Sequence, residues 1–477
     1  MIWHVDGQVR EPAAADRGAP RVALTALGCK VNYAEMAQLA GEVAAAGCEV
    51  VPDDQPADIR VLNSCTVTLR ADATTRQRLA RLRRRDPGCH IVLTGCSVDG
   101  NPQRYLGAPM PPVVGHPMAQ CGSPRDGVAA MLKRQSIDAV FSNAQKGALA
   151  AHVLDVARRR RGLAAPWAAT RPPLRSRAFI KVQDGCDHRC TYCAVWRARG
   201  PSCSLPPDSI ISQARRAAAS GHAEIVLCGV DLGSYGRDLG TTLAALLTSL
   251  LEGIPQVRVR LSSINANDVG DDLIALNRHP RLCSHWHLPL QSGSDAVLKA
   301  MHRGYRRSQY LRVVRGLREA DPWTELTTDV MVAFPGETDG DHAATLSIVE
   351  DVCFLACHVF RYSPRPDTPA DGLKGRVTDP VARRRSAEVR RAAMHAGSQA
   401  RRRALGRVHE VVWDRVEPGR AHGLASTYHL IIAAPTSHTR AGSLQRVHAH
   451  TLEAEHIAGD ILEPPGGMIS GGAERHG

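Results

Sequence analysis

The chain has 477 residues, of which 43% are hydrophobic and 22% charged, so it is long enough for two or three domains with packed cores. Lys and Arg (60) outnumber Asp and Glu (47) by 13, which suits a polyanionic partner such as nucleic acid. No segment has the roughly eighteen uninterrupted apolar residues of a membrane span, and Asp6, Glu11 and Asp16 interrupt the N-terminus where a signal peptide has its apolar core. These features argue against a membrane, exported or mainly disordered protein, and they predict a cytoplasmic one.

Residues 21–161 alternate between short apolar runs and amphipathic runs. This alternation predicts an open parallel α/β domain, in which each strand is followed by a helix. A proline-rich insertion is expected over residues 99–135 and a linker over residues 162–176. The expected strands are Val22–Leu27, a run around Val61 and Leu62, a run that begins at Ile91–Leu93, and Ile137–Phe141; the expected helices are Tyr33–Ala46, Arg76–Arg85 and Lys146–Arg161.

Three cysteines stand out in this first domain by their position. Cys29 follows the first strand, Cys65 the second and Cys96 the third. Because the carboxyl ends of parallel strands share one edge of a sheet, the three thiols can converge in space. Their spacing alone leaves two interpretations open, since each could be a buried core residue or a metal ligand.

The central part, residues 176–400, has six strand-like runs separated by helical stretches. Six βα units predict a partial (βα)6 barrel, in which functional residues lie at the carboxyl ends of the strands. The expected strands are Phe179–Val182, Glu224–Val230, Arg258–Ile264, His285–Leu290, Leu326–Phe334 and His358–Tyr362.

The C-terminal part changes character after an arginine-rich stretch at residues 376–407. Residues 404–462 contain three runs with strand-like composition, which predict a small all-β barrel of the oligonucleotide-binding kind. Residues 463–477, rich in Gly and Pro, are expected to form a loose tail. The three runs are Arg407–Arg415, Ala421–Ala433 and Arg446–Leu462.

The strongest chemical signal is a C-x3-C-x2-C loop directly after the first barrel strand, formed by Cys186, Cys190 and Cys193. Three thiolates this close can bind three irons of a [4Fe-4S] cluster and leave the fourth iron open. A structural zinc site is one alternative, and His188 is the nearest candidate for its fourth ligand. Inert buried cysteines are the other alternative. The strand context favours the iron–sulfur interpretation.

Several sequence blocks together resemble the radical S-adenosylmethionine (SAM) methylthiotransferase family, from about residue 21 to about residue 462. The resemblance implies that Cys186, Cys190 and Cys193 hold the SAM-cleaving [4Fe-4S] cluster. It also implies that Cys29, Cys65 and Cys96 hold an auxiliary [4Fe-4S] cluster. The blocks are LGCKVN, NSCTVT and TGC, then IKVQDGCDHRCTYC, RVRLSSI, HLPLQSGSDAVLKAM, TTDVMVAFPGET and HVFRYSPRPDTPA.

The family's reaction replaces a C–H bond of an aromatic base by a methylthio group. One SAM is the methyl donor, and a second SAM is the source of the radical that activates the base carbon. By this resemblance, five residues near the ends of barrel strands are candidates for contacting SAM or substrate, and packing or helix capping is an equal alternative for each. They are Ser262, Ser263, Gln291, Ser292 and Asp329.

The branch that the chain most resembles acts on tRNA, at C2 of N6-threonylcarbamoyladenosine at position 37. Three segments carry this likeness: Leu232–Asp238, Ala198–Gly200 and Tyr362–Ala370. The C-terminal segment resembles the RNA-binding TRAM domain, and the reaction implies an electron donor such as flavodoxin or ferredoxin. Other branches act on isopentenyladenosine in tRNA or on an aspartate of a ribosomal protein. A non-catalytic iron–sulfur RNA-binding protein is an alternative of another class.

The chain departs from the family pattern at two positions beside the cysteine loop. Relatives usually have proline where this chain has Trp196, and a basic residue where it has Cys203. All six expected cluster cysteines are present, so we expect an active enzyme.

Overall fold

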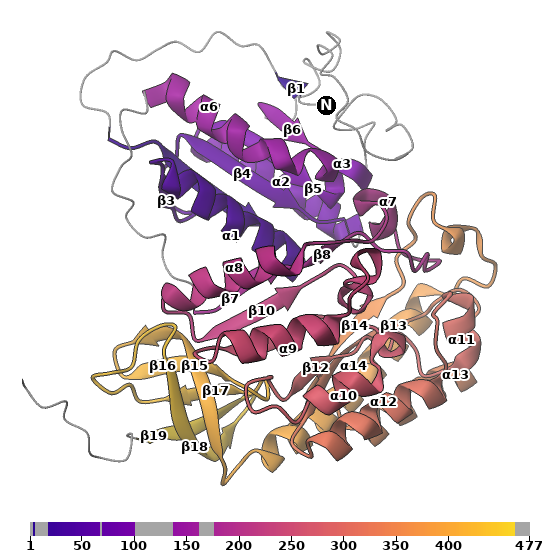
Figure 1. Ribbon diagram of the computed structural model, residues 1–477. Coiled ribbons are helices and arrows are strands. Elements are labelled where there is room, and N and C mark those ends of the chain that lie inside the picture. Colours follow the sequence, from indigo (N-terminus) through magenta and orange to yellow (C-terminus); the bar gives the residue numbers. More distant parts are fainter. Residues whose placement is uncertain (1–2, 5–17, 67–68, 101–136, 162–175, 463–477) are drawn as a thin grey trace, which may run out of the picture.

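The computed structural model describes residues 3–4, 18–66, 69–100, 137–161 and 176–462 (Figure 1). The predicted tail lies outside these residues, as do nearly all of the predicted insertion and linker. An N-terminal α/β sheet lies above a central set of parallel strands, and a C-terminal group of strands lies below one end of that set (Figure 1). The exact domain boundaries stay a prediction.

The N-terminal sheet is the predicted open α/β arrangement, with the strand order β1-β6-β5-β4-β2-β3. All its pairings are parallel except that of β1 with β6. The antiparallel edge strand β1 and the short strand β3 were not predicted, since neither has an apolar run of its own. The strands are β1 (Trp3–His4), β2 (Arg21–Ala26), β3 (Glu49–Val51), β4 (Ile59–Ser64), β5 (His90–Gly95) and β6 (Ala139–Phe141); the α-helices are α1 (Lys30–Ala45), α2 (Leu69–Arg85), α3 (Cys96–Gly100) and α6 (Leu149–Arg161).

The central part contains the six expected parallel strands, arranged as two three-stranded sheets with the orders β11-β10-β7 and β12-β13-β14. Isolated bridges from Val259 to Leu282 and from Ser263 to His287 connect the two sheets. The strands are β7 (Ala178–Lys181), β10 (Glu224–Cys228), β11 (Arg258–Leu261), β12 (His285–His287), β13 (Glu325–Val332) and β14 (Ala356–Arg361); the main helices are α8 (Pro207–Ala219), α9 (Leu243–Gly253), α10 (Asp271–Leu276), α11 (Asp295–Ala300), α12 (Arg307–Ala320) and α13 (Asp339–Val352).

All six of these strands end earlier than predicted, by one to three residues. The prediction continued β12 to Leu290, for example, but regular pairing stops at His287. The apolar residues that follow, such as Leu288 and Leu290, are buried in loops at the carboxyl edge, so hydrophobicity alone does not mark the end of a strand.

The six strands have two faces of different chemistry. On the outer face, apolar residues such as Leu227, Val259 and Leu326 pack against the helices in the largest hydrophobic core. Side chains alternate along a strand, so the intervening residues point to the opposite side, which we call the inner face. Helix α1 of the N-terminal domain covers the inner face of β10, where Val31 and Ala34 pack against Val226 and Cys228.

The C-terminal strands form a closed five-stranded barrel in the order β15-β16-β17-β19-β18, reached through the long helix α14. Two of the three predicted strand runs are each a pair of strands with a turn between them. In the first pair the turn contains Tyr428, which has a left-handed φ of 72°. The elements are α14 (Asp379–Arg403), β15 (Val408–Glu417), β16 (Arg420–Ala425), β17 (Leu430–Ala433), β18 (Leu444–Glu453) and β19 (His456–Leu462).

A buried charge group joins the C-terminal barrel to the central strands. The Glu224 carboxylate accepts hydrogen bonds from Arg258 Nε at 2.7 Å and Arg260 Nε at 2.7 Å. The same two guanidiniums donate to four backbone carbonyls of the C-terminal barrel, at distances of 2.8 to 3.1 Å. Burial would raise the pKa of Glu224, but Arg260 and Arg258 lower it to about 2. Glu224 therefore stays charged at neutral pH and fixes both arginines in their docking positions.

We expect Glu224→Gln to destabilise the protein by about 3–5 kcal/mol, because it leaves two buried guanidiniums without their shared carboxylate. Urea unfolding at pH 7 would measure the loss. The matched control is Glu417→Gln, at an exposed position at the end of β15, which is expected to change stability by no more than about 0.5 kcal/mol. Equal effects of the two substitutions would contradict this role of Glu224.

Candidate active site

The three loop cysteines lie at the carboxyl end of β7, between β8 (Gln183–Asp184) and β9 (Cys203–Ser204). Gly185 opens the loop with a φ of +71°, and a Cβ at this position would lie 1.9 Å from the carbonyl oxygen of Pro201. Only glycine fits there. Glycine is therefore required directly before Cys186, because the turn at the start of the loop has no room for a side chain.

The loop thiols are surrounded by N–H donors. The backbone N–H of Val195 donates to Cys193 Sγ at 3.3 Å, and Arg303 Nη1 donates to Cys190 Sγ at 3.4 Å. Burial raises the pKa of Cys193 to about 11, and burial together with Asp231 raises the pKa of Cys186 to about 12. Three thiols in one loop, with N–H groups directed at two of them, fit the ligand set of an iron–sulfur cluster, whose ligands lose their protons on binding.

His188, the candidate for the fourth ligand of a zinc site, contacts two carboxylates in this structure. Its Nε2 lies 3.3 Å from an Asp231 oxygen and 3.4 Å from an Asp268 oxygen. The hydrogen bonds to Asp231 and Asp268 raise the pKa of His188 to about 10. The zinc interpretation of the loop stays an alternative.

The structure also brings the three N-terminal cysteines to one edge of the sheet. Cys29 is the N-cap of α1, Cys65 follows β4, and Cys96 begins α3 after β5. A Cβ on Gly28 would lie 2.5 Å from Cys65 Sγ, so the first two segments touch. The Cys29 thiol is close enough to Cys96 to contribute to the raised pKa of Cys96, after the larger effect of burial.

Arg199 connects the two groups of cysteines. It ends α7 (Val195–Arg199), which follows the cysteine loop, and its side chain is only 1% exposed. A guanidinium has five N–H donors, and the structure gives five acceptors for them. They are Cys96 Sγ at 3.2 Å, Glu35 Oε1 at 3.0 Å, Glu35 Oε2 at 3.4 Å, Asp184 Oδ1 at 2.8 Å and Asn32 Oδ1 at 2.6 Å.

Glu35 balances the charge of this junction. Lys146 forms a short ion pair with it, and Lys181 Nζ lies 3.1 Å from Glu35 Oε1. Burial would raise the pKa of Glu35, but Lys146, Arg199 and Lys181 hold it well below its usual range. The carboxylate is therefore ionised, and it fixes the cations beside Cys96.

A second arginine crosses the same domain boundary. Arg365 Nη1 donates to Asp72 Oδ2 at 2.8 Å, and Arg365 Nη2 donates to Thr66 Oγ1 at 2.7 Å. Asp72 also accepts from Ser97 Oγ at 2.7 Å. Thr66 is the residue after Cys65, and Ser97 is the residue after Cys96. Arg365 therefore holds the segments of both cysteines in position, directly through Thr66 and through Asp72 to Ser97.

The sequence of this chain matches two protein families and several known enzymes. The Radical SAM superfamily model matches residues 180–349, and the model of uncharacterized protein family UPF0004 matches residues 21–113. Over 82% of this chain and 86% of the relative, the sequence is 37% identical to the threonylcarbamoyladenosine tRNA methylthiotransferase MtaB of Thermotoga maritima. The chain belongs to the radical SAM methylthiotransferases.

Two further relatives of this chain are named as tRNA-modifying enzymes of the same kind. A Bacillus subtilis protein with the same name is 35% identical over 76% of this chain and 78% of its own. A tRNA-2-methylthio-N(6)-dimethylallyladenosine synthase of Thermus thermophilus is 33% identical, covering 78% of this chain and 76% of its own. Among solved structures, the radical SAM methyltransferase TsrM of Kitasatospora setae has a TM-score of 0.52 and 14% identity, covering 74% of this chain and 77% of that one, which supports the fold.

Membership in the radical SAM family implies SAM and one [4Fe-4S] cluster. When bound, such a cluster supplies the electron that cleaves SAM. The C-x3-C-x2-C spacing and the N–H groups around the thiols suit the loop cysteines for this role. In the described parts of the chain, no helix is long and apolar enough to cross a membrane.

The five candidates for SAM or substrate contacts lie in different settings. Ser262 and Ser263 follow β11, and the buried Ser262 Oγ has no hydrogen-bond partner among the described residues. Gln291 has a left-handed φ of 63°, and its backbone forms an isolated β-bridge to Val330 of β13.

The last two candidates contact other side chains. Ser292 is buried against Thr345, and the distance between their hydroxyl oxygens is 3.4 Å, which fits a packing role. Asp329 lies within β13, 3.3 Å from His287 Nε2. The contacts of all five candidates with cofactor or substrate stay a prediction.

The inner face of the second three-stranded sheet carries polar side chains that sequence reasoning missed. Thr327 Oγ1 lies 2.9 Å from His285 Nε2 and 2.9 Å from His287 Nδ1. His358 of β14 pairs in register with Asp329, and its ring centre lies 6.0 Å from that of His287. Histidines at alternate positions of a short strand could have indicated this polar wall.

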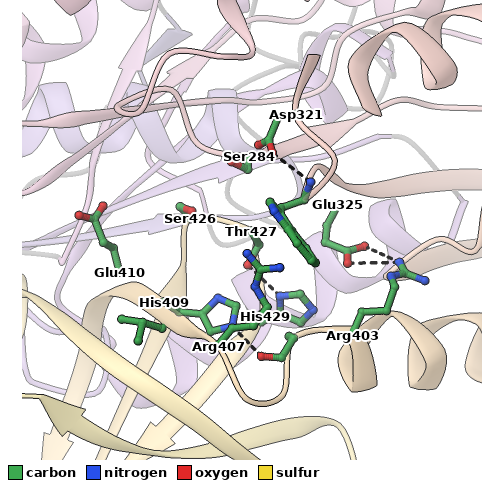
Figure 2. Close-up of a pocket in the computed structure, with 13 residues that line it drawn as sticks. Ser284, Asp321, Glu325, Arg403, Arg407, His409, Glu410, Ser426, Thr427 and His429 are labelled. Carbon is green, nitrogen blue, oxygen red and sulfur yellow. Dashed lines mark hydrogen bonds and ion pairs between the residues drawn. The ribbon is translucent and has the colours of Figure 1, made fainter. Parts of the chain in front are cut away.

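A cavity of about 220 Å³ lies at the opposite end of these strands, where β13 begins and the C-terminal barrel docks (Figure 2). Glu325 and Arg403 form one wall, and His429 and Thr427 form another. Arg403 Nη2 donates to both Glu325 oxygens at 3.3 Å. Because it lies at the amino ends of the strands, this cavity is separate from the cysteine edge.

We expect Arg199→Met to lower the free energy of unfolding by about 3–5 kcal/mol, because it removes all five hydrogen bonds of this guanidinium and leaves the buried Glu35 carboxylate with only Lys146 and Lys181. Urea unfolding of the anaerobically purified protein would measure this loss. Arg197→Met, on the exposed side of the same helix, is the control and is expected to cost less than about 0.5 kcal/mol. A small effect at Arg199 would show that the junction does not depend on it.

The raised pKa of Glu325 predicts that the stability of the protein depends on pH. Burial raises its pKa from 4.5 to about 7, although Arg403 and Arg318 oppose the shift. Its stabilising contribution is full below pH 4.5 and is lost as the pH rises through about 7. The stability of Glu325→Gln relative to the parent is therefore expected to rise by about 1–3 kcal/mol between pH 5 and pH 8. Chemical unfolding at both pH values measures it, with Glu319→Gln on exposed α12 as the control; a pH-independent difference would contradict the shift.

Proposed function

We propose that this enzyme installs a methylthio group at C2 of N6-threonylcarbamoyladenosine at position 37 of tRNA. One SAM is the methyl donor, and a second is the radical source. The observation that carries this proposal is that the buried Arg199, in the helix that follows the loop cysteines, donates to Cys96 Sγ of the N-terminal cysteine group at 3.2 Å. The sequence relatives named for this reaction support the choice of substrate.

In this proposal, Cys29, Cys65 and Cys96 hold an auxiliary [4Fe-4S] cluster. The donor set fits, because three thiols meet at one sheet edge and Cys96 Sγ accepts N–H groups from Arg199 at 3.2 Å and Asn143 at 3.9 Å. The nearby cations Arg199 and Lys146 favour thiolates over thiols. The protein's own residues, above all Arg199 and Glu35, position the N-terminal cysteine segments against the helix that follows the cysteine loop.

The polarity of the inner face supports the threonylcarbamoyl branch over the isopentenyl branch. A threonylcarbamoyl group carries a carboxylate, a hydroxyl and a urea linkage, whereas an isopentenyl group is a hydrocarbon. Hydrocarbon substituents favour pockets lined by apolar side chains. The inner face instead presents His285, His287, Thr327, Asp329 and His358, which can hydrogen-bond a polar substituent.

We further propose that the C-terminal barrel is TRAM-like and binds the RNA. The chain's surplus of 13 basic residues supports this, since phosphate contacts supply most of the affinity for nucleic acid. Ferredoxin or flavodoxin is the class of electron donor that the reaction would take, and a cytoplasmic location would suit both partners.

Three alternatives compete with this proposal. Isopentenyladenosine in tRNA is one substrate alternative, and it has a relative of its own among the sequence matches. An aspartate of a ribosomal protein is the other. A non-catalytic iron–sulfur RNA-binding protein belongs to a different class, and anaerobic cleavage of SAM to 5′-deoxyadenosine by the purified protein would exclude it.

Deleting the gene is expected to remove 2-methylthio-N6-threonylcarbamoyladenosine from total tRNA and to accumulate its unmethylthiolated precursor. Mass spectrometry of the nucleosides measures both. The parent gene is expected to restore the product, and Cys190→Ala or Cys96→Ala is not, because each removes a proposed cluster ligand. Cys353→Ala is the control, since this cysteine lies away from both sites. Loss of the isopentenyl nucleoside instead would overturn the branch, and unchanged nucleosides would move the search to protein targets.

A further inference from the structure

Lys30 occupies an unusual position between the three parts of the molecule. It directly follows Cys29 and begins α1 of the N-terminal domain. Its Nζ lies 5.8 Å from the ring centre of Tyr428, which belongs to the turn between β16 and β17 of the C-terminal barrel. Among the residues that the structure describes, no carboxylate forms an ion pair with Lys30. Lys30 is half-buried, so its ammonium is available to an anion that reaches this face.

Tyr428 stacks directly on the inner face of the central strands. Its ring lies 4.0 Å from that of His285 with an interplanar angle of 10°, and Arg260 Cζ lies 5.3 Å from its centre. His285 is 1% exposed, and its Nδ1 has no hydrogen-bond partner among the described residues. One side chain from each domain therefore lies at this point of the inner face: Lys30, Tyr428 and His285.

The charges around this place do not cancel. Arg258, Arg260 and Lys30 contribute three positive charges, and Glu224 contributes one negative charge. Asp329 lies farther along the inner face and pairs with His287. The local surplus attracts an anion, and the low exposure of its walls strengthens that attraction.

We propose that Lys30 binds the carboxylate of the substrate's threonylcarbamoyl group and thereby selects this substrate over adenosines with a neutral substituent. This inference rests on the proposed function, because only that branch provides a carboxylate on the base. Lys30 directly follows a proposed ligand of the auxiliary cluster, and its side chain reaches from there toward Tyr428 on the inner face. The unpartnered His285 Nδ1 provides a further polar group for the same substituent.

The test compares two anticodon stem–loop RNAs that differ only in charge. One carries N6-threonylcarbamoyladenosine, and the other carries the methyl ester of its threonine carboxylate; a third RNA with unmodified adenosine serves as reference. Dissociation constants are measured anaerobically with the holoenzyme and with Lys30→Met, Lys30→Arg and Lys299→Met. Lys299 is an exposed lysine on α11, so its replacement gives the same change in net charge away from the inner face.

We expect the parent enzyme to bind the acid about tenfold more tightly than the ester, as is typical of a hydrogen-bonded charge pair. With Lys30→Met the ratio of the two dissociation constants should fall to about one while the affinity for the ester is kept. Lys30→Arg should preserve most of the ratio, and Lys299→Met should leave it unchanged.

A parent enzyme that binds acid and ester equally, but both better than the adenosine RNA, would overturn the role of Lys30 and leave the proposed substrate intact. An unchanged ratio in Lys30→Met would overturn it as well. If the parent does not distinguish the threonylcarbamoyl RNA from the adenosine RNA, the proposed function itself fails. The parent's acid-to-ester ratio needs no substitution, so the inference can be refuted even if the Lys30 variants fold poorly.

Discussion

The architecture of the active site depends on one saturated guanidinium. Arg199 uses all five of its N–H groups, and its acceptors come from the helix after Cys29, from the residue that follows β5, and from the strand before the cysteine loop. Such a side chain cannot shift without breaking several charge-assisted hydrogen bonds at once. The relative position of the two cysteine groups is therefore fixed by a rigid, planar group in addition to the apolar packing of α1 on β10.

The second end of the central strands is held by the same kind of interaction. Glu224 orients Arg258 and Arg260 so that they reach backbone carbonyls of the C-terminal barrel. Backbone carbonyls are present whatever the side chains are, so this docking constrains few residues of the barrel itself. The inner face is thereby enclosed at both ends, with the cysteines at one end and Tyr428 at the other, and the polar wall of histidines lies between them.

The sequence was sufficient for the parallel α/β pattern, the six central strands and the positions of the six cysteines after strands, because apolar periodicity and strand ends are local signals. It could not predict Arg199, Arg365 or Glu224 as junction residues, since a charged residue in a sequence gives no sign of a partner 164 or 293 residues away. Nor did it show that Ala421–Ala433 is two strands. The apolar pattern continues through the turn at Tyr428, whose left-handed backbone has no glycine to mark it.

The order of the docking residues along the chain has a consequence for biosynthesis. Glu35, Cys96 and Asp72 are translated long before Arg199 and Arg365, with which they pair. Since domains fold as they emerge from the ribosome, the N-terminal domain exists for a time with its buried carboxylates still hydrated and its cysteine edge uncovered. During this interval the thiols of Cys65 and Cys96, which are buried in the complete structure, stay accessible to solvent.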